Sequence, residues 1–371
     1  MAAGPREPRA LENMPRALEN IGETCYFNAV LQQLARAPGF GDAVDAVAAA
    51  ADAPEPTLAA ASATSAADVR LLQALRQTLA ALRDVDASAT TAAGAEAAAA
   101  AARAPVAPRA FAASCEGLGL AYDVLQQNDA AEFLGKVLEA LDRASASEAS
   151  DTATGAFAAA VARSAAGCFQ GRLEHRRSEA RPSSGAGEGD AGAGDAADSD
   201  GWSHWRTSEP FFRVDLEVTG GGDVGDALRA FTEEVTISGD GGRMIRRTTR
   251  FAELPPVLTL HLKRFALDYA TFEVTKVLDR CAFPKRLDMR PYCADGGFND
   301  QSFVYSLGGV VIHVGFTATD GHYVALVRVM GKWFICDDAR VEVFDVSHLE
   351  KFFGGAASAV LLFYDKTALL R

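Results

Sequence analysis

The sequence predicts an α+β protein, in which helices come first along the chain and strands come later. The N-terminal half holds alanine- and leucine-rich segments with helical spacing. The C-terminal half holds short runs of β-branched and aromatic residues between Gly, Asp and Lys turns. With 371 residues, of which 49% are hydrophobic, the chain can bury a substantial core as one large domain or two ordinary ones.

Composition and charge argue against several classes of protein. The chain has six cysteines and no hydrophobic stretch after its N-terminus that resembles a signal peptide, so we expect free thiols in a reducing compartment. The longest apolar-looking segment, residues 92–105, is mostly alanine and carries Glu96 and Arg103, so no transmembrane helix is predicted. A net charge of −13 disfavours general binding to nucleic acid; it suits a basic partner and equally serves solubility.

The first segments in the chain are a leader and a short helix. The sequence PRALEN occurs at 8–13 and again at 15–20, and only the second copy runs directly into the segment around Cys25. Residues 1–19 are therefore predicted to be a flexible leader. Residues 26–37 carry apolar side chains at helical spacing and predict a helix that begins next to Cys25.

Two further helices are predicted before the strands begin. Alanine dominates residues 43–113, where the leucine spacing at 68–85 predicts one amphipathic helix flanked by low-complexity linker. Residues 128–144 predict a strong helix capped by Asn128. Its apolar face holds Phe133, Val137, Leu138 and Leu141.

After a second low-complexity segment the pattern becomes that of strands. Residues 177–201 are rich in Gly, Ala, Ser and Asp and predict a flexible insertion, because they have almost nothing to bury. Alternating or continuous β-branched and aromatic runs then predict strands. These runs are residues 211–218, 255–265, 303–315, 322–329, 332–338 and 358–365.

Cys25 is the cysteine whose position indicates chemistry. It lies at the N-terminus of the predicted helix, where unpaired N–H groups and the helix dipole stabilise a thiolate. A free cysteine is more often a small buried hydrophobe, and that interpretation holds for the other five. A thiolate nucleophile also needs an imidazole to share its proton and an acidic group to orient the imidazole.

His322 is the histidine that best fits this requirement. It lies in an Asp-Gly-His-Tyr turn between two predicted strands, and the next strand ends in Asp337 and Asp338. Adjacent antiparallel strands would bring one of these carboxylates beside the imidazole. His313 competes with it, but His313 and His261 lie on apolar runs and are interpreted as satisfied core histidines. The surface histidines are predicted to be His175, His204 and His348.

The order of the motifs resembles the catalytic domain of the ubiquitin-specific proteases, papain-like cysteine peptidases that remove ubiquitin from proteins. Five stretches carry the resemblance: NIGETCYFNAVLQQL, LQQNDAAEFLGKVLEAL, LPPVLTLHLKRF, YSLGGVVIHVGFTATDGHYVALV, and KWFICDD with the closing AVLLFYD. The resemblance implies one catalytic domain over residues 20–371. It would comprise a helical thumb at about 20–165, fingers at about 166–255 and a β-rich palm at about 256–371, with low-complexity insertions near 43–113 and 177–201.

The resemblance also implies the catalytic roles. It makes Cys25 the nucleophile, His322 the general base and then acid, and Asp337 the group that orients the imidazole, with Asp338 assisting. Asn20 matches the asparagine whose side-chain amide joins the Cys25 backbone N–H in an oxyanion hole. The turn at Gly22 would let Asn20 fold back toward Cys25.

The implied substrate is the C-terminal tail of ubiquitin, which ends in two glycines after arginines. By resemblance, Asp129 and Glu132 face these arginines and Gln127 belongs to the same binding motif. Gly321 and Tyr323 would help to line the channel for the two glycines. The alternative is that Asp129 and Glu132 are only favourable charges in the first turn of a helix.

Three departures from the family pattern change the expectations. Glu23 replaces an asparagine two residues before Cys25, and we expect its charge to point to solvent. Asn128 replaces the second glutamine of the Q-Q-D motif, which need not disturb the carboxylate. The two C-x-x-C pairs of many members are missing, so we predict shortened fingers, no structural zinc and no cofactor.

The sequence therefore predicts a thiol-dependent deubiquitinase, a monomer whose partners are ubiquitin and ubiquitinated proteins, in the cytoplasm, the nucleus or both. No nucleic acid or membrane partner is predicted. Two alternatives stay open: an inactive ubiquitin-binding scaffold, and a protease for another modifier that ends in two glycines. The sequence does not specify the preferred chain linkage, the physiological substrate or the role of the insertions.

Overall fold

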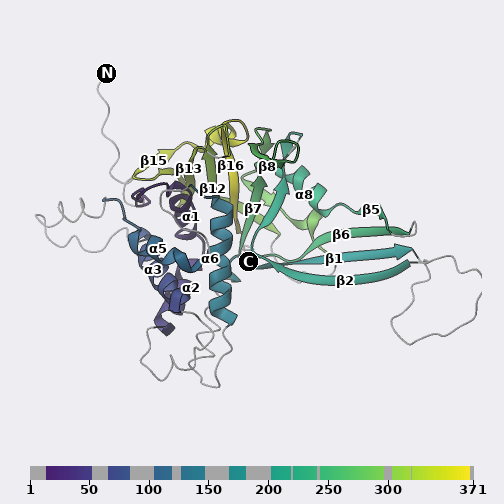
Figure 1. Cartoon of the computed structure of the whole chain (residues 1–371), viewed down its shortest axis with the longest axis horizontal. Helices are drawn as coiled ribbons and strands as arrows, with labels where there is room; N and C mark the ends of the chain where they lie inside the picture. The colour runs from purple at the N-terminus through teal and green to yellow at the C-terminus, as the bar shows by residue number, and fades with distance from the viewer. Residues whose placement is uncertain are drawn as a thin grey trace, which may run out of the picture.

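The fold has the predicted α+β class. The computed structural model describes residues 14–51, 66–83, 104–118, 127–146, 167–180, 202–218, 220–239, 243–295, 303–318 and 320–367. Figure 1 shows helices on the left, a long sheet in the middle and a narrower sheet that extends to the right. No helix within the described ranges is long and apolar enough to cross a membrane.

The helical region comes from the first part of the chain. Its elements are α1 (Cys25–Leu34), α2 (Phe40–Ala51), α3 (Ala66–Arg83), α5 (Arg109–Ser114), the 3-10 helix η3 (Cys115–Leu118) and α6 (Ala130–Ala146). Helix α3 confirms the amphipathic helix predicted at 68–85. The stretch predicted as linker opens instead with α2, because Phe40 and Val44 are fully buried and give α2 an apolar face toward the core.

Helix α1 is buried along its whole length, from Cys25 to Leu34. It packs against α6 on one side and against strands β12 (Val304–Val314) and β13 (His322–Val329) on the other. Its polar Gln33 is paired with the sheet, since Nε2 donates to the carbonyls of Val310 and Leu326, both at 3.0 Å. A side chain at Gly309 would overlap Gln33, so a glycine is needed for this close approach. The helix that begins at Cys25 is therefore fixed between two layers.

The long sheet contains all the strands predicted after residue 210. Their order is β15-β14-β13-β12-β16-β7-β3, with β11 paired to β12 at one side. All neighbours are antiparallel except β3 and β7. The remaining bounds are β3 (Val214–Glu217), β7 (Val257–Lys263), β11 (Arg286–Asp288), β14 (Lys332–Asp337), β15 (Arg340–Phe344) and β16 (Ala357–Lys366).

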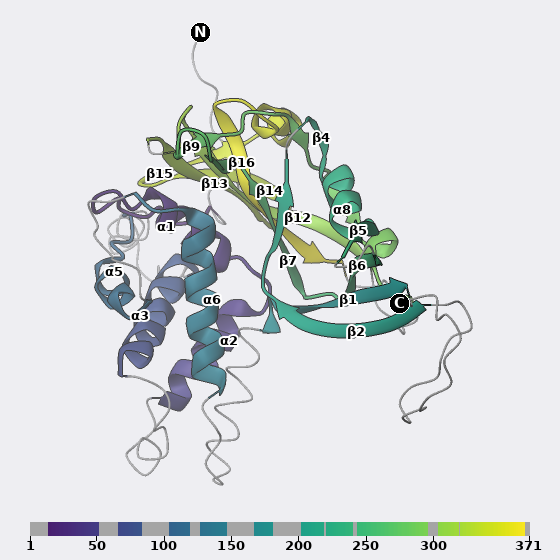
Figure 2. The same cartoon turned by 45° about the vertical axis from the view of Figure 1, so that its right-hand side comes forward.

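Two hydrophobic cores lie on the two faces of this sheet. One core joins the sheet to α1, α3 and α6, and the other joins it to helix α8 (Val224–Thr232). Figure 2 shows α6 and α8 on opposite sides of the long sheet. The helical layer that carries Cys25 is thus packed directly on the sheet that carries the histidine and aspartate candidates.

The second sheet occupies the segment predicted as fingers. Its order is β2-β1-β6-β5, formed by β1 (Gly171–Ala180), β2 (Trp202–Phe211), β5 (Val235–Ser238) and β6 (Met244–Glu253). The predicted flexible insertion began too early, because residues 177–180 belong to β1 and pair with β2. The rest of that insertion, residues 181–201, lies outside the described residues.

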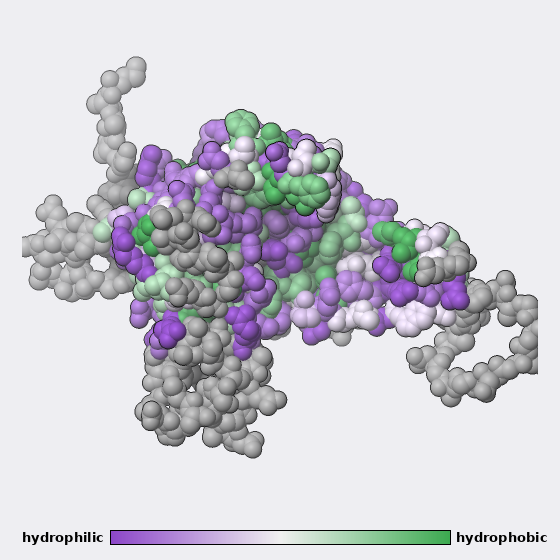
Figure 3. All heavy atoms as spheres, in the orientation of Figure 1, coloured by the Kyte–Doolittle hydropathy of each residue, from purple (hydrophilic) through white to green (hydrophobic). Residues whose placement is uncertain are grey.

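The shorter elements connect these layers. They are β4 (Gly222–Asp223), β8 (Phe265–Asp268), β9 (Glu273–Lys276), β10 (Cys281–Ala282), and the 3-10 helices η5 (Arg290–Tyr292) and η6 (Val346–Phe352). Strands β8 and β9 form a hairpin, and hydrophobic atoms gather over it in the space-filling view of Figure 3. Leu267, Tyr269 and Phe272 are exposed there.

The predicted leader is partly folded. Leu18 is fully buried, its N–H donates to the carbonyl of Asp338 at 3.0 Å, and it bridges to Val106. Residues 14–19 therefore pack against the end of β14, because their apolar side chains and backbone groups find partners there. The first PRALEN copy lies outside the described residues.

Candidate active site

Cys25 is the first residue of α1, and its side chain is 2% exposed. The chain before it makes a tight turn in which Oδ1 of Asn20 accepts hydrogen bonds from the N–H groups of Gly22 at 3.1 Å and Thr24 at 3.2 Å. Gly22 has φ 151°, a conformation that favours glycine. Asn20 therefore folds back toward Cys25 as predicted, and Glu23 is exposed as expected. The sulfur lies where helix N–H groups favour negative charge.

Of the other five cysteines, Cys115, Cys168, Cys281 and Cys336 are buried and Cys293 is partly buried. All six cysteines are free. Burial raises the pKa of Cys168 and Cys281 to about 11 and that of Cys115, Cys293 and Cys336 to about 12. These thiols are held in the protonated, unreactive form.

The structure brings His322 and Asp337 together beside Cys25. His322 begins β13, Asp337 ends the neighbouring β14, and Nε2 of the imidazole lies 2.6 Å from Oδ1 of Asp337. A hydrogen bond with the Cys25 sulfur raises the pKa of His322 to about 9, and the bond to Asp337 adds to this while burial opposes it. With Nε2 on Asp337, Nδ1 is the ring nitrogen left for Cys25. The structure thus places Cys25, His322 and Asp337 close to one another.

Asp338 has different partners from Asp337. Its nearest carboxylate oxygen is 4.0 Å from Nε2 of His322. Instead it accepts hydrogen bonds from Nδ2 of Asn20 and from Nδ2 of Asn28, both at 2.8 Å. Asp338 also adopts a left-handed backbone conformation with φ 46°, which aspartate tolerates. Its carboxylate thus ties the turn before Cys25 and the first turn of α1 to the end of β14.

The sequence interpretation missed Asn28. It is 2% exposed on a helix that is otherwise mainly apolar, one turn after Cys25. Buried amides are nearly always hydrogen-bonded, so a polar residue at this position was a signal that a partner lies nearby.

Gln127 contacts Cys25, the predicted nucleophile. Its Nε2 lies 3.7 Å from Sγ of Cys25 and donates to the carbonyl of Gly321 at 2.8 Å. Gln127 was predicted as a substrate-binding residue, and Gly321 as part of the channel. The structure places both at the point where the channel would meet Cys25.

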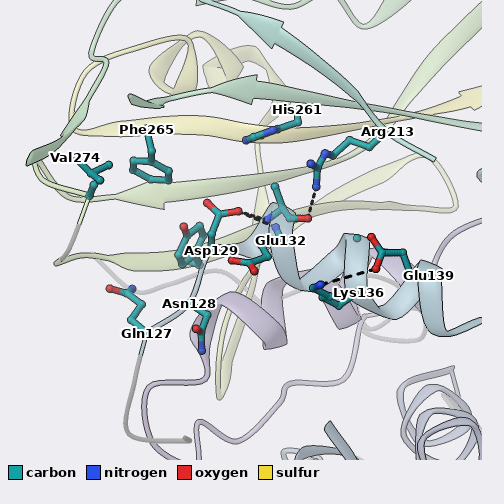
Figure 4. Close-up of a pocket in the computed structure, with 14 residues that line it drawn as sticks. Gln127, Asn128, Asp129, Glu132, Lys136, Glu139, Arg213, His261, Phe265 and Val274 are labelled. Atoms are coloured by element: carbon teal, nitrogen blue, oxygen red, sulfur yellow. Dashed lines mark hydrogen bonds and ion pairs between the residues drawn. The ribbon is translucent and has the colours of Figure 1, made fainter. Parts of the chain in front are cut away.

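A cavity of about 620 Å³ adjoins this point, between α6 and the long sheet. Figure 4 shows Asp129 and Glu132 on the α6 side and His261 and Phe265 on the opposite side. Asp129, Glu132 and Tyr323, three of the predicted substrate-binding residues, all line it. Tyr323 is 3% exposed, and burial raises the pKa of its hydroxyl well above the usual value.

Asp129 caps α6, a role that was predicted for Asn128. Oδ1 of Asp129 accepts hydrogen bonds from the N–H groups of Ala131 and Glu132, both at 2.8 Å. Asn128 instead donates from Nδ2 to the hydroxyl of Tyr26 at 3.1 Å. The helix begins one residue later than predicted because the aspartate carboxylate accepts two N–H groups at once. One oxygen of Asp129 thus serves the helix, while the residue also lines the cavity.

The sheet side of the cavity holds two residues that were not predicted as site residues. His261 was interpreted as a core histidine, but it lines the cavity and Nδ1 lies 3.0 Å from Oδ1 of Asp215. Arg213 donates from Nε to the same oxygen at 2.7 Å and from Nη1 to the carbonyl of Ala131 on α6. Burial alone would raise the pKa of Asp215, but hydrogen bonds from His261 and Arg213 lower it. The sequence signal that could have indicated this side of the cavity is the alternation along β3. Val214 and Leu216 face the core, so Asp215 between them faces away from it.

Within the described residues, His322, Asp337 and Asp338 are the one group of three His, Cys, Asp or Glu side chains close enough to share a cation. Their ligand atoms lie within 4.8 Å of one another. These atoms already bond to each other and to the two asparagines. The absence of a structural zinc stays a prediction.

Comparison with solved structures relates the fold to one deubiquitinating enzyme module. A chain in the structure titled "Structure of the SAGA Ubp8/Sgf11/Sus1/Sgf73 DUB module bound to ubiquitin aldehyde" superposes with a TM-score of 0.65. The match covers 99% of this chain and 72% of that chain, at 19% sequence identity. At this identity the likeness establishes the fold.

Curated relatives match only in part. Ubiquitin carboxyl-terminal hydrolase 46 of Caenorhabditis elegans is 31% identical over 160 residues, which is 41% of this chain and 37% of that protein. Ubiquitin carboxyl-terminal hydrolase 15 of Schizosaccharomyces pombe is 34% identical over 158 residues, 40% of this chain and 14% of that protein. The chain thus covers well under half the length of these relatives.

The comparison with protein families covers nearly the whole sequence. Residues 16–364 match the family described as ubiquitin carboxyl-terminal hydrolase. This range contains every residue of the site described above. The chain belongs to the ubiquitin carboxyl-terminal hydrolase family.

Proposed function

We propose that this chain is a cysteine-type deubiquitinase, which hydrolyses the bond after the C-terminal glycine of ubiquitin. The observation that carries the proposal is that Cys25, at the N-terminus of a buried helix, lies beside His322, whose imidazole is hydrogen-bonded to Asp337 at 2.6 Å. This is the geometry that an activated thiol nucleophile needs.

The first chemical step forms a thioester. The thiolate of Cys25 adds to the carbonyl carbon of the terminal glycine, and the carbonyl electrons move onto oxygen. The C–N bond then breaks as the imidazolium of His322 donates its proton to the leaving lysine amine. Asp337 holds Nε2, so the proton on Nδ1 points at the reacting atoms.

The second step releases ubiquitin. Neutral His322 takes a proton from a water molecule, whose oxygen adds to the thioester carbonyl. The C–S bond breaks, the glycine leaves as a carboxylic acid, and the thiolate and imidazolium are restored. Both steps pass through a tetrahedral oxyanion. The backbone N–H of Cys25 and the second N–H of the Asn20 amide, whose first N–H bonds to Asp338, are the proposed donors to it.

The cavity supports a basic tail as the substrate. Asp129, Glu132 and Glu139 bring carboxylates to it from α6, and Arg213 and Lys136 balance only part of this charge. Gly321 and Gln127 lie between the cavity and Cys25. A tail that ends in two glycines would suit an approach past this contact, because glycine brings no side chain to the space beside Cys25.

The test is hydrolysis of ubiquitin that carries a fluorogenic amide at its C-terminus. We expect turnover by the wild type and none by Cys25→Ser, with unchanged binding of free ubiquitin. The same fluorogenic amide on other modifiers that end in two glycines is the matched comparison. Turnover of one of these in place of ubiquitin would reassign the substrate, whereas binding without turnover by the wild type would favour the scaffold alternative.

A further inference from the structure

A lysine is buried behind the catalytic histidine without a carboxylate partner. Lys276, at the end of β9, is 8% exposed. Its three N–H groups share four acceptors: Nδ1 of His313 at 2.9 Å and the carbonyls of His313 at 3.0 Å, Gly315 at 2.7 Å and Ala356 at 2.7 Å. In the described part of the chain no carboxylate pairs with it. Burial, and after it the positive charge of Arg264, lower the pKa of Lys276 to about 8.

The acceptors of Lys276 belong to segments that meet at the active site. His313 and Gly315 end β12 and open the turn that leads to His322, and Ala356 directly precedes β16. The N–H of Gly315 also donates to the carbonyl of Ala356 at 3.0 Å. One ammonium thus joins the β8–β9 hairpin, the turn before His322 and the start of β16.

His313 continues this connection to the nucleophile. Its ring is 1% exposed and packs edge-on against Tyr323, with ring centres 4.9 Å apart. It also lies directly against Gly321, where a side chain would overlap the ring. Gly321 accepts the hydrogen bond of Gln127, and Gln127 contacts Cys25. Burial, Lys276 and His322 together lower the pKa of His313 to about 4, so the ring is neutral and Nδ1 accepts from the ammonium.

A buried ammonium is a poor way to gain stability, because its desolvation offsets much of what its hydrogen bonds contribute. The ammonium instead fixes the geometry of the groups around it. Three N–H donors on one atom fix the positions of the carbonyls around it, which an apolar side chain of the same size cannot do. We propose that Lys276 is a positioning residue, which holds the end of β12 at His313 and Gly315 against the start of β16, so that His322 stays beside Cys25 and Asp337.

The effect on turnover rests on the proposed function, so the test has a second readout that needs no ubiquitin. The variant is Lys276→Met, which keeps the length of the side chain and removes the donors. The matched control is Lys366→Met, at the opposite end of β16. Lys366 is also partly buried, with its pKa lowered by burial, and donates to a backbone carbonyl, that of Leu254. Both variants remove a buried ammonium, but only Lys276 lies behind the site.

The first readout is steady-state hydrolysis of fluorogenic ubiquitin. A loosened turn misplaces the imidazole, so kcat of Lys276→Met should fall between about tenfold and a hundredfold, with KM within about twofold. The second readout is the rate at which iodoacetamide alkylates Cys25, followed by mass spectrometry over a range of pH. In Lys276→Met this rate should be lower at each pH, because a displaced imidazole no longer takes the proton of the thiol. Lys366→Met should match the wild type in both.

Each outcome decides the proposal. A folded Lys276→Met with kcat within about twofold of the wild type and an unchanged alkylation profile would overturn it, as would an equal loss in Lys366→Met. If Lys276→Met does not fold, His313→Phe takes its place, since it keeps a ring against Gly321 and removes one acceptor. A smaller fall in both kcat and the alkylation rate of His313→Phe would support the proposal. If both quantities stayed at the wild-type values, the proposal would be contradicted. If the wild type cleaves no ubiquitin, but Cys25 is alkylated more slowly in Lys276→Met than in the wild type, only the proposed function would be rejected.

Discussion

Charged groups pair differently at two places: the edge of the long sheet that carries His322, Asp337 and Asp338, and Arg177 in the four-stranded sheet. At the edge, Asp338 bonds to Asn28, 310 residues away in the sequence, and its side chain is only 13% exposed. In the four-stranded sheet, Arg177 pairs with Glu179, two residues along the same strand. Long-range buried pairs fix where one element lies relative to another, whereas local surface pairs contribute little. Substituting a charged residue at this edge of the long sheet should therefore lower kcat, whereas substituting one in the second sheet should not.

The largest effect is expected from Asp337→Ala. Without the carboxylate, Nε2 of His322 loses its 2.6 Å partner and the imidazole is neither oriented nor stabilised as a cation. We expect kcat for fluorogenic ubiquitin to fall about a hundredfold or more. The thermal midpoint should change little, since Asp337 is partly exposed. A kcat within about threefold of the wild type would show that another group orients the imidazole.

A smaller loss of activity, with a loss of stability, is expected from Asp338→Ala. This change leaves the amides of Asn20 and Asn28 without their carboxylate acceptor. A buried donor without a partner costs about 1–3 kcal/mol, which urea unfolding should detect. We expect kcat to fall about tenfold because the turn before Cys25 is loosened. If Asp338→Ala lost as much activity as Asp337→Ala and no stability, Asp338 would be a direct partner of His322 instead.

Raising the pH should destabilise the folded state, because His322 loses its proton. Its pKa is raised from an ordinary 6.5 to about 9, so the folded state holds this proton more tightly than the unfolded state. The stabilisation is fully present below pH 6.5 and is lost as the pH rises through about 9. The free energy of unfolding should therefore decline over this range, and kcat/KM should fall above about pH 9. His322→Ala should remove this dependence, and a profile unchanged by that substitution would exclude His322 as its source.

The smallest effect is expected from Arg177→Ala in the four-stranded sheet. Arg177 is exposed, pairs locally with Glu179 and lies over the ring of Trp205. Its removal should change the free energy of unfolding by less than about 1 kcal/mol and leave kcat unchanged. A loss of kcat comparable to that of Asp338→Ala would break the comparison, because it would connect the second sheet to the chemistry.

The sequence allowed the central site to be predicted, because each catalytic candidate lies at an element boundary with a local signature. Cys25 opens a helix, His322 opens a strand after a glycine turn, and Asp337 ends the next strand. Adjacent antiparallel strands then bring the last two together. The long sheet was predictable because its strands are rich in β-branched and aromatic residues.

The remaining contacts could not be predicted from local pattern. The pairing of Asn28 with Asp338 and the contact of Gln127 with Cys25 depend on how distant segments pack. The strands of the second sheet were not predicted; in β1, charged residues occupy both faces and hide the alternation of period two. The cavity wall at Arg213 and His261 follows only from the register of β3 with β7.

The central claim is that Cys25 is a nucleophile presented to the C-terminus of ubiquitin. The most direct measurement is mass spectrometry of the protein after reaction with ubiquitin that carries a thiol-reactive group at its C-terminus, with Cys25→Ala as the control. The account predicts one covalent adduct on Cys25 in the wild type and none in the variant. An adduct on another cysteine, or no adduct on folded wild-type protein, would contradict it.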